Sequence, residues 1–460
     1  MKRKLVRSIM AAGLAAAMAV TAVGCGGKQN NEEDKGGSDN QSEESDGADD
    51  SNEDVGEPNG DYEACTLTIS WWGGDDRHMP TQEAIKAFQK EYPGIKIENT
   101  YAAWDGWEEK MATAFVAGTA QDVNQVNWNW INQYDKNGEA FLDLNDYAEQ
   151  IDMSQFDSSY LEMCQIAGTQ AAMPVSMTGR IFYWDKTSFD EVGIEVPKSY
   201  ADLLAAGKAF AEYDDSYYPL ALAEYDRTML MVYYLESKYG DDWVVDGELQ
   251  YDQAKVEEGL KFIQELEDNH VTPKISKLAG DGAASLDQNQ NWIDGHYAGI
   301  FEWDSSAGKF AKALEEGREI VVGDYFSDWG EHKGGFAKVS MGWAINAKTE
   351  HPKEAAMLVN FLLNNEAAAE ILGSSRGIPA SKSALAKAGS VEGLLDPLTV
   401  EANGKVLAWC SNELDPMFED SRLKNSDGVY YDVMAGLSYG DYDISEAAAT
   451  LIDGINSVIQ

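Results

Sequence analysis

The stretch Cys65–Ala102, CTLTISWWGGDDRHMPTQEAIKAFQKEYPGIKIENTYA, carries two apolar β-type segments around one amphipathic segment. Residues 65–70 predict a buried strand, residues 80–94 a helix that Pro93-Gly94 ends, and residues 95–102 a second strand. Residues 106–120 then predict another helix, and residues 122–130 a third strand ending in aromatic residues. This alternation predicts a parallel sheet with right-handed crossovers.

Polar and aromatic residues lie at or just after the carboxyl ends of all three predicted strands. They occupy residues 71–78, 104–107 and 127–130. Ligands of open α/β sheets bind beyond the carboxyl ends of the strands. We therefore expect these three segments to converge on one edge of the sheet.

The rest of the chain predicts a second α/β region. Strands are expected from Arg180 and over residues 296–306, and a strand over 334–348 crosses between lobes. Helices are expected over 197–213, 257–269, 351–372 and from Ser445 onward. With 460 residues, the chain is too long for one ordinary core, so two lobes are expected.

The N-terminus has the features of an export signal. A basic segment, MKRKLVR, and an apolar segment precede Ala22-Val23-Gly24-Cys25, which resembles the lipobox of bacterial lipoproteins. The resemblance implies a signal peptide over residues 1–24 and a lipidated Cys25 at the extracellular face of the cell membrane. Residues 25–63 are rich in Gly, Ser, Asn, Asp and Glu, which predicts a disordered acidic tether.

Charge and cysteine content exclude several classes of function. The formal net charge of −45 argues against nucleic acid or an anionic lipid surface as a partner, because phosphate binding needs clustered Lys and Arg. Cys65, Cys164 and Cys410 have no zinc-type spacing and are expected to be buried thiols without chemistry. No metal site and no cofactor are predicted.

A set of motifs in a fixed order resembles one family. TLTISWWGGDDRH, AGTAQDV, GRIFYWDKTSFDEVGIEVPKSYADL, WIDGHYAGIFEWDSS, MGWAINAK and RGIPASKSAL are similar to segments of the extracellular solute-binding proteins of carbohydrate ABC transporters, which include maltose-binding protein. The resemblance runs from Cys65 to the C-terminus. One departure is an additional tryptophan, because this chain has Tyr183-Trp184-Asp185-Lys186 where many members have Tyr-Asn-Lys. Trp184 is either a stacking platform or packed behind the sheet.

The resemblance implies a periplasmic-binding-protein-like type II α/β fold with two lobes, a hinge and a cleft between them. The lobes would comprise residues 64–175 plus 342–385 and residues 176–341 plus 386–460. The protein would be a monomer that carries a sugar to permease subunits driven by a separate ATPase.

The chemistry of a sugar selects the candidate binding residues. Its C–H faces suit Trp and Tyr rings, and its hydroxyls suit Asp, Glu, Asn and Arg. The many tryptophans favour an oligosaccharide, and strand alternation sends only one of the two tryptophans at 71–72 toward the cleft. The candidates are Trp71, Trp72, Asp75, Asp76, Arg77, Trp104, Asn129, Trp130, Glu224, Tyr225, Glu302, Trp303, Asp304, Trp343 and Arg376.

Two alternatives compete with a sugar-binding protein. A surface glycoside hydrolase could pair Asp75 or Asp76 with Glu302, although no catalytic family motif is present. A receptor for a metal or a peptide could use the segment 287–294, DQNQNWID. That segment places Trp292 where a calcium loop needs glycine. We expect a protein without enzymatic activity.

Overall fold

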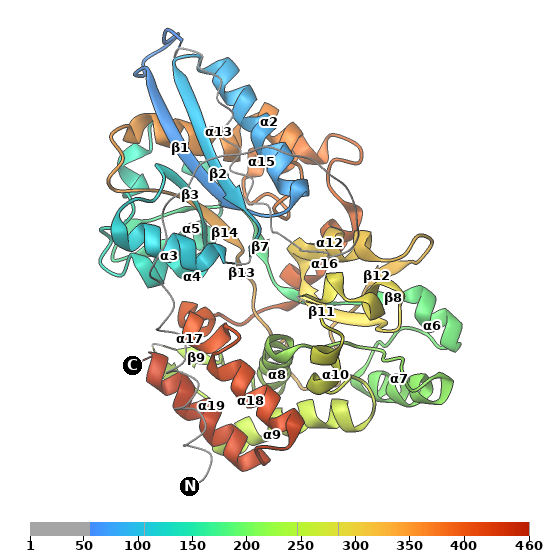
Figure 1. The fold of residues 1–460 in the computed structure, drawn as a ribbon. Coiled ribbons are helices and arrows are strands. Elements are labelled where there is room, and N and C mark those ends of the chain that lie inside the picture. The colour runs from blue at the N-terminus through green and yellow to red at the C-terminus, as the bar shows by residue number, and fades with distance from the viewer. Residues whose placement is uncertain (1–55, 105, 246, 284, 460) are drawn as a thin grey trace, which may run out of the picture. The chain divides into compact units, whose positions relative to one another are not determined.

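A computed structural model of the chain describes residues 56–104, 106–245, 247–283 and 285–459 (Figure 1). The expected signal peptide, the expected lipidation at Cys25 and most of the expected tether lie outside the described residues. Among the helices of the described part, none has both the length and the hydropathy that crossing a bilayer requires.

The first sheet contains the predicted parallel strands. β1 (Cys65–Trp72) pairs in parallel with β2 (Ile95–Ala102) and β3 (Val123–Asn127). Two further strands, β14 (Met341–Ile345) and β6 (Met173–Pro174), complete the order β2-β1-β3-β14-β6 and run antiparallel to their neighbours. The predicted parallel pairing of these three strands is therefore confirmed, and a segment distant in the chain extends the sheet.

Helices of the first lobe cover this sheet. The α-helices are α2 (Asp75–Glu91), α3 (Trp107–Ala117), α4 (Trp128–Tyr134), α5 (Ser158–Glu162), α13 (Pro352–Asn364), α14 (Glu366–Leu372) and α15 (Lys382–Gly389). α2 packs against α13 and α14, with the rings of Phe88 and Phe361 5.4 Å apart (Figure 1). The short strands β4 (Gln165–Ile166) and β5 (Thr169–Gln170) form a hairpin.

Two sequence predictions about these elements are wrong. α2 begins at Asp75, five residues before the predicted start, and contains Pro80 within it. The third strand ends at Asn127, so Trp128, Asn129 and Trp130 lie on α4 rather than on the strand. The helix buries these side chains against neighbouring elements, and such tertiary packing overrides the β-preference of tryptophan.

The second sheet is antiparallel and has the order β11-β8-β12. Its strands are β8 (Arg180–Asp185), β11 (Gly299–Trp303) and β12 (Ile320–Val322). The hairpin of β9 (Val244–Val245) and β10 (Glu248–Leu249) lies apart from this sheet. Trp184 is fully buried and stacks on Phe182 at 5.2 Å, so this family departure packs in the core.

Helix α8 packs against α9 and α18, and Figure 1 shows α18 and α19 beside α8 and α9. These four belong to the larger set of α-helices of the second lobe. That set comprises α6 (Lys186–Val192), α7 (Tyr200–Tyr213), α8 (Glu224–Tyr239), α9 (Gln253–Asp268), α10 (Ile275–Gly280), α11 (Gln290–Ile293), α12 (Ala307–Ala313), α16 (Pro397–Trp409), α17 (Ser421–Lys424), α18 (Val429–Tyr439) and α19 (Ile444–Ile459). The 3-10 helices are η1 (Leu144–Tyr147), η2 (Met153–Gln155), η3 (Leu286–Gln288), η4 (Asp304–Ser306) and η5 (Pro416–Glu419).

Two short strands connect the two sheets. β7 (Met177–Thr178) lies between β6 and β8 in the chain, and β13 (Lys338–Val339) directly precedes β14. They pair antiparallel, with Lys338 opposite Thr178. This pair is where the chain passes between the lobes, while the exact lobe boundaries remain a prediction.

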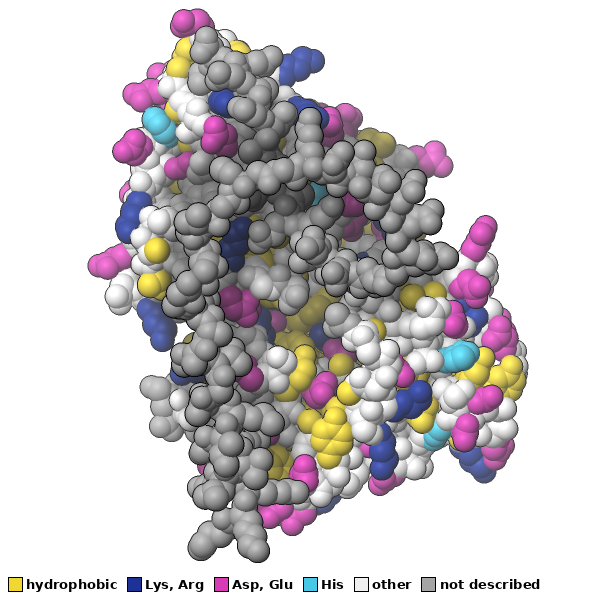
Figure 2. Space-filling model, viewed as in Figure 1, with side chains coloured by type: hydrophobic (Ala, Val, Ile, Leu, Met, Phe, Trp, Pro, Cys, Tyr) yellow, Lys and Arg dark blue, Asp and Glu magenta, His cyan; other side chains and the backbone are white. Residues whose placement is uncertain are grey.

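The surface of the protein reflects its acidic composition. Figure 2 shows Asp and Glu side chains dispersed over the visible described surface, with Lys and Arg interspersed. The three cysteines predicted to be unreactive are all free; Cys65 and Cys164 are buried and Cys410 is half-buried.

Candidate functional site

Three tryptophans from different elements meet at the end of the first sheet. Trp72 ends β1, Trp104 follows β2, and Trp130 lies on α4. The Trp72 ring lies 5.1 Å from that of Trp104 and 5.4 Å from that of Trp130. Trp104 and Trp130 are stacked, with centroids 6.0 Å apart and an interplanar angle of 17°. Trp104 is 40% exposed while the other two are buried, so it can offer ring surface to a ligand.

Trp71 does not join this group. It is fully buried, stacks on Tyr101 at 5.0 Å, and donates a hydrogen bond from Nε1 to Nδ1 of His78 at 3.0 Å. Burial lowers the pKa of His78. The alternation of side chains along β1 thus separates the two tryptophans: Trp71 lies in the lobe core, and Trp72 lies with Trp104 and Trp130.

A buried arginine organises the second group of residues. Arg180 begins β8, forms an ion pair with Asp226, and donates a hydrogen bond to the carbonyl of Phe301 at 2.8 Å. Its guanidinium carbon lies 5.2 Å from the ring centre of Tyr225 and 5.0 Å from that of Trp303. The Nε atom of Arg180 is buried and has no hydrogen-bond partner among the described residues. An unpaired buried donor is costly, so it is a natural contact for a ligand oxygen.

Carboxylates surround this arginine. Nη2 of Arg180 lies 3.6 Å from Oε1 of Glu302. Burial lowers the pKa of Arg180, but the Glu302 and Asp226 carboxylates outweigh it and raise that pKa above its ordinary value. Burial raises the pKa of Glu302, and Arg180 opposes this shift. The guanidinium therefore stays charged within the protein.

A buried lysine also lies near the ring of Trp303. Nζ of Lys338, on β13, is 4.9 Å from the ring centre of Trp303 and 5.7 Å from that of Trp128. It pairs with Oε2 of Glu419 at 2.7 Å. Burial raises the pKa of Glu419, but Lys338 and the other neighbouring groups together lower it by more, so the pKa lies below its ordinary value. Trp303 therefore has two cations within 5.0 Å of its ring centre, which the electron-rich face of an indole stabilises.

Helix α4 connects the three tryptophans to the buried cations. Trp130 packs against Trp72 and Trp104, and Trp128, on the same helix, lies 5.7 Å from Nζ of Lys338. Between them, Asn129 donates from Nδ2 to the carbonyl of Glu419 at 2.8 Å, and its Oδ1 has no hydrogen-bond partner within the described ranges. We call the combined set the aromatic–cation cluster; it comprises Trp72, Trp104, Trp128, Trp130, Arg180, Tyr225, Trp303 and Lys338.

Three other candidates form a third group, and Arg77 of this group donates from Nη1 to the carbonyl of Trp72 at 3.3 Å. Arg376 is buried over the ring of Trp343 at 5.3 Å and donates from Nε to Oε1 of Gln125 at 2.8 Å. Arg77 donates to the carbonyl of Ser375 at 3.3 Å, and burial lowers its pKa to about 10. Trp343 and Arg376 line a cavity of about 40 Å³, which is little more than the volume of one water molecule.

The acidic candidates have distinct locations. Asp75 and Asp76 are exposed in the first turn of α2, where negative charge stabilises a helix. Glu224 begins α8, and burial raises its pKa. Asp304 is buried and accepts hydrogen bonds from Thr178 and, at 2.6 Å, from Nδ2 of Asn403. Asp304 therefore anchors the crossing strand β7.

The possible calcium segment folds as two helical turns. Its residues belong to η3 and α11, with Trp292 fully buried. Asp287 pairs with Lys309 at 2.8 Å.

Sequence reasoning missed five members of the site. Arg180 and Lys338 lie in segments read as strands, and charge within an apolar strand was a usable signal. Trp128 was assigned to a strand end without being singled out. Asp226 and Glu419 gave no local signal, because their roles depend on the cations they face.

The comparisons with known proteins agree with this architecture. The family model for bacterial extracellular solute-binding proteins matches residues 78–369. A periplasmic oligogalacturonide-binding protein of Yersinia enterocolitica, solved with saturated digalacturonic acid, is 31% identical with a TM-score of 0.81. A periplasmic solute-binding protein of Pectobacterium atrosepticum is 31% identical with a TM-score of 0.82. Each alignment covers 86% of this chain and 98% of the other.

A curated relative matches over a shorter region. A predicted binding protein of Brucella abortus is 28% identical over 128 residues, which is 28% of this chain and 31% of that protein. The match thus spans about a third of the relative's length. Together with the long structural alignments, the family match shows that the chain belongs to the bacterial extracellular solute-binding protein family and has its two-lobed α/β fold, as the sequence predicted.

Proposed function

We propose that this protein is the substrate-binding component of an ABC importer and that it captures an oligosaccharide at the aromatic–cation cluster. The observation that carries the proposal is the gathering of indole rings and buried cations from both sheets around α4. Indole faces suit the C–H faces of sugar rings, and charged hydrogen bonds suit their oxygens.

An acidic oligosaccharide suits this cluster best. Arg180 has an unpartnered Nε, and a guanidinium binds a carboxylate in a fixed geometry. A similar protein, 31% identical, was solved with saturated digalacturonic acid. In the proposed complex, a uronate carboxylate competes with Glu302 or Glu419 for the buried cations, which selects against neutral sugars.

Delivery of the sugar follows the plan implied by the family. The lobes close by a hinge at β7 and β13, and the closed monomer docks on membrane permease subunits that a separate ATPase drives. A lipid on Cys25 would hold the protein at the extracellular face of the bacterial membrane. The family match and the paired crossing strands support this plan.

A glycoside hydrolase is the main competing reading. It would use Asp75 or Asp76 with Glu302. The two aspartates are exposed on the first turn of α2, whereas Glu302 is engaged near Arg180. The family match favours binding without turnover. Two further similar structures, both 30% identical, are de novo designed esterases, with TM-scores of 0.74 and 0.75.

Isothermal titration calorimetry with a panel of saccharides tests the proposal. The panel contains digalacturonate, trigalacturonate and neutral oligosaccharides of the same lengths, and a set of short peptides is titrated alongside. We expect saturable one-to-one binding of the acidic sugars with a Kd on the order of 1 μM, which corresponds to about −8 kcal/mol. Binding of a peptide but of no saccharide would overturn the substrate class. Shorter sugars appearing in the incubation mixture would overturn the binding-only reading.

A further inference from the structure

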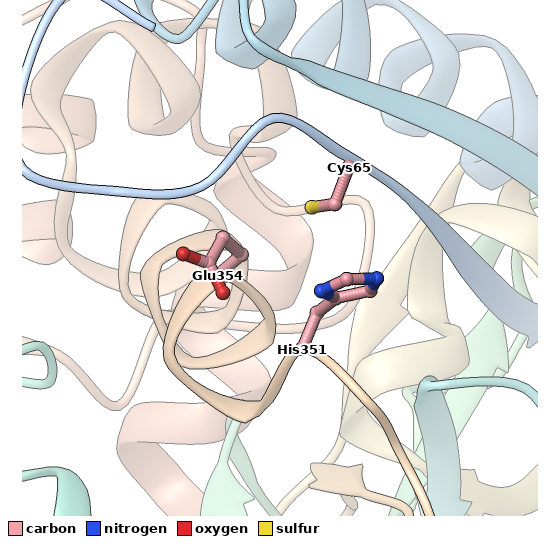
Figure 3. Close-up of side chains that lie close together, drawn as sticks. All are labelled: Cys65, His351 and Glu354. Atoms are coloured by element: carbon pink, nitrogen blue, oxygen red, sulfur yellow. The ribbon is translucent and has the colours of Figure 1, made fainter.

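Three metal-ligating side chains lie together at the start of β1, away from the residues assigned to sugar binding. Cys65 is the first residue of β1, His351 directly precedes α13, and Glu354 lies in the first turn of α13. One potential ligand atom of each residue lies within 4.8 Å of the others. Figure 3 shows the thiol, imidazole and carboxylate turned toward a common space between the strand and the helix.

The surroundings of these three side chains leave part of their hydrogen-bonding capacity unused. Cys65 and Glu354 are buried and His351 is half-buried. Oε1 of Glu354 accepts a hydrogen bond from the backbone N–H of Glu63 at 2.8 Å. Nδ1 of His351 is buried, and no residue in the described part of the chain forms a hydrogen bond with it. Because buried polar atoms almost always have partners, an unpaired imidazole nitrogen beside a thiol and a carboxylate indicates a missing ligand.

The donor set identifies the class of cation. Thiolate sulfur, imidazole nitrogen and carboxylate oxygen together are the ligands that Zn²⁺ takes in proteins, whereas Ca²⁺ and Mg²⁺ prefer oxygen alone. We propose that Cys65, His351 and Glu354 bind a zinc-type divalent cation, with water at the fourth position. Bond lengths of about 2.0–2.3 Å place the ligand atoms of a tetrahedral site roughly 3.5 Å apart. Side-chain rotations that move the ligand atoms by about 1 Å therefore close the site.

Binding has a defined cost and a defined benefit. Burial, with a contribution from Glu354, raises the pKa of Cys65 to about 12, so a cation has to displace the thiol proton. In return, the cation ties the first strand of the sheet to α13, which joins it much later in the chain. The half-exposed imidazole provides an entry path. This site is independent of the proposed sugar function.

The experiment uses the full chain and two probes, CoCl₂ for spectroscopy and ZnCl₂ for calorimetry. We expect Co²⁺ to give a thiolate-to-metal charge-transfer band and Zn²⁺ to displace it. Cys65→Ser should remove the band, and His351→Gln should weaken Zn²⁺ binding by roughly 10-fold or more, as loss of a ligand costs at least as much as loss of its outer partner. Cys410→Ser, which changes a half-buried thiol elsewhere in the chain, serves as the matched control and should retain both signals.

Two results would overturn the site. One is the absence of a thiolate band in the unmodified protein. The other is a band and a Zn²⁺ affinity that are the same in Cys65→Ser as in Cys410→Ser. Circular dichroism of each variant checks that it folds. The Co²⁺ band of the unmodified protein tests the site even if a variant fails to fold. Sugar binding by Cys65→Ser should stay within about 2-fold of the unmodified protein, because none of the three ligands belongs to the aromatic–cation cluster.

Discussion

Asp304 provides a prediction whose magnitude follows from the structure. Its carboxylate is 1% exposed and lies between Thr178 of the crossing strand β7 and Asn403 of α16. Burial raises the pKa of Asp304 from 3.8 to about 6, although hydrogen bonds from Thr178 and Asn403 oppose the shift. A shift of about two units corresponds to about 3 kcal/mol between the two protonation states.

The sign of the effect follows from proton binding. The folded protein holds this proton more tightly than the unfolded chain, so stability from this group is full below pH 3.8 and is lost as the pH rises through about 6. Between about pH 7.5 and about pH 4.5, Asp304 alone should add about 2 kcal/mol to the free energy of unfolding. Asp304→Asn removes that contribution because an amide does not titrate.

Urea unfolding followed by tryptophan fluorescence measures the effect at both pH values. Other carboxyl groups titrate in the same range, so the informative quantity is the difference between the unmodified protein and Asp304→Asn. That difference should shift by about 2 kcal/mol in favour of the unmodified protein at the lower pH. Asp75→Asn, at an exposed position, controls for loss of one negative charge. A difference that stays constant across pH would refute the reasoning.

Three further predictions concern the aromatic–cation cluster. Trp104→Ala should weaken sugar binding by about 0.5–1.5 kcal/mol in calorimetry while leaving Tm nearly unchanged, because Trp104 is 40% exposed; unchanged affinity would remove it from the site. Arg180→Met should lower the free energy of unfolding in urea by about 3–5 kcal/mol, since it strands the buried carboxylate of Asp226; a loss below about 1 kcal/mol would contradict the pairing. Lys338→Met should reduce affinity for digalacturonate more than for a neutral disaccharide, and equal losses would argue against charge recognition.

The sequence predicted the fold well where the pattern is local. Alternation of apolar strands and amphipathic helices predicted the parallel pairing of β1, β2 and β3. It failed at Asn127, where the chain turns from strand into α4, because burial of Trp128 and Trp130 by distant elements decides that helix. Local propensity carries no information about those contacts.

The candidate site was predictable only in part, for a related reason. The rule that ligands bind beyond strand ends singled out the segments of Trp72, Trp104 and Trp130, which the structure brings together. It also selected Trp71, because the sequence does not say which face of β1 is the core. Lys338 and Glu419 are far apart in the chain, and their pairing depends on how it returns between the lobes.

The most direct test of the central claim is a crystal structure of the protein with digalacturonate bound. The account predicts sugar rings against Trp104 and Trp303, with a uronate carboxylate within hydrogen-bond distance of Arg180 or Lys338. Sugar bound elsewhere, with these rings and cations in contact only with protein atoms, would contradict it.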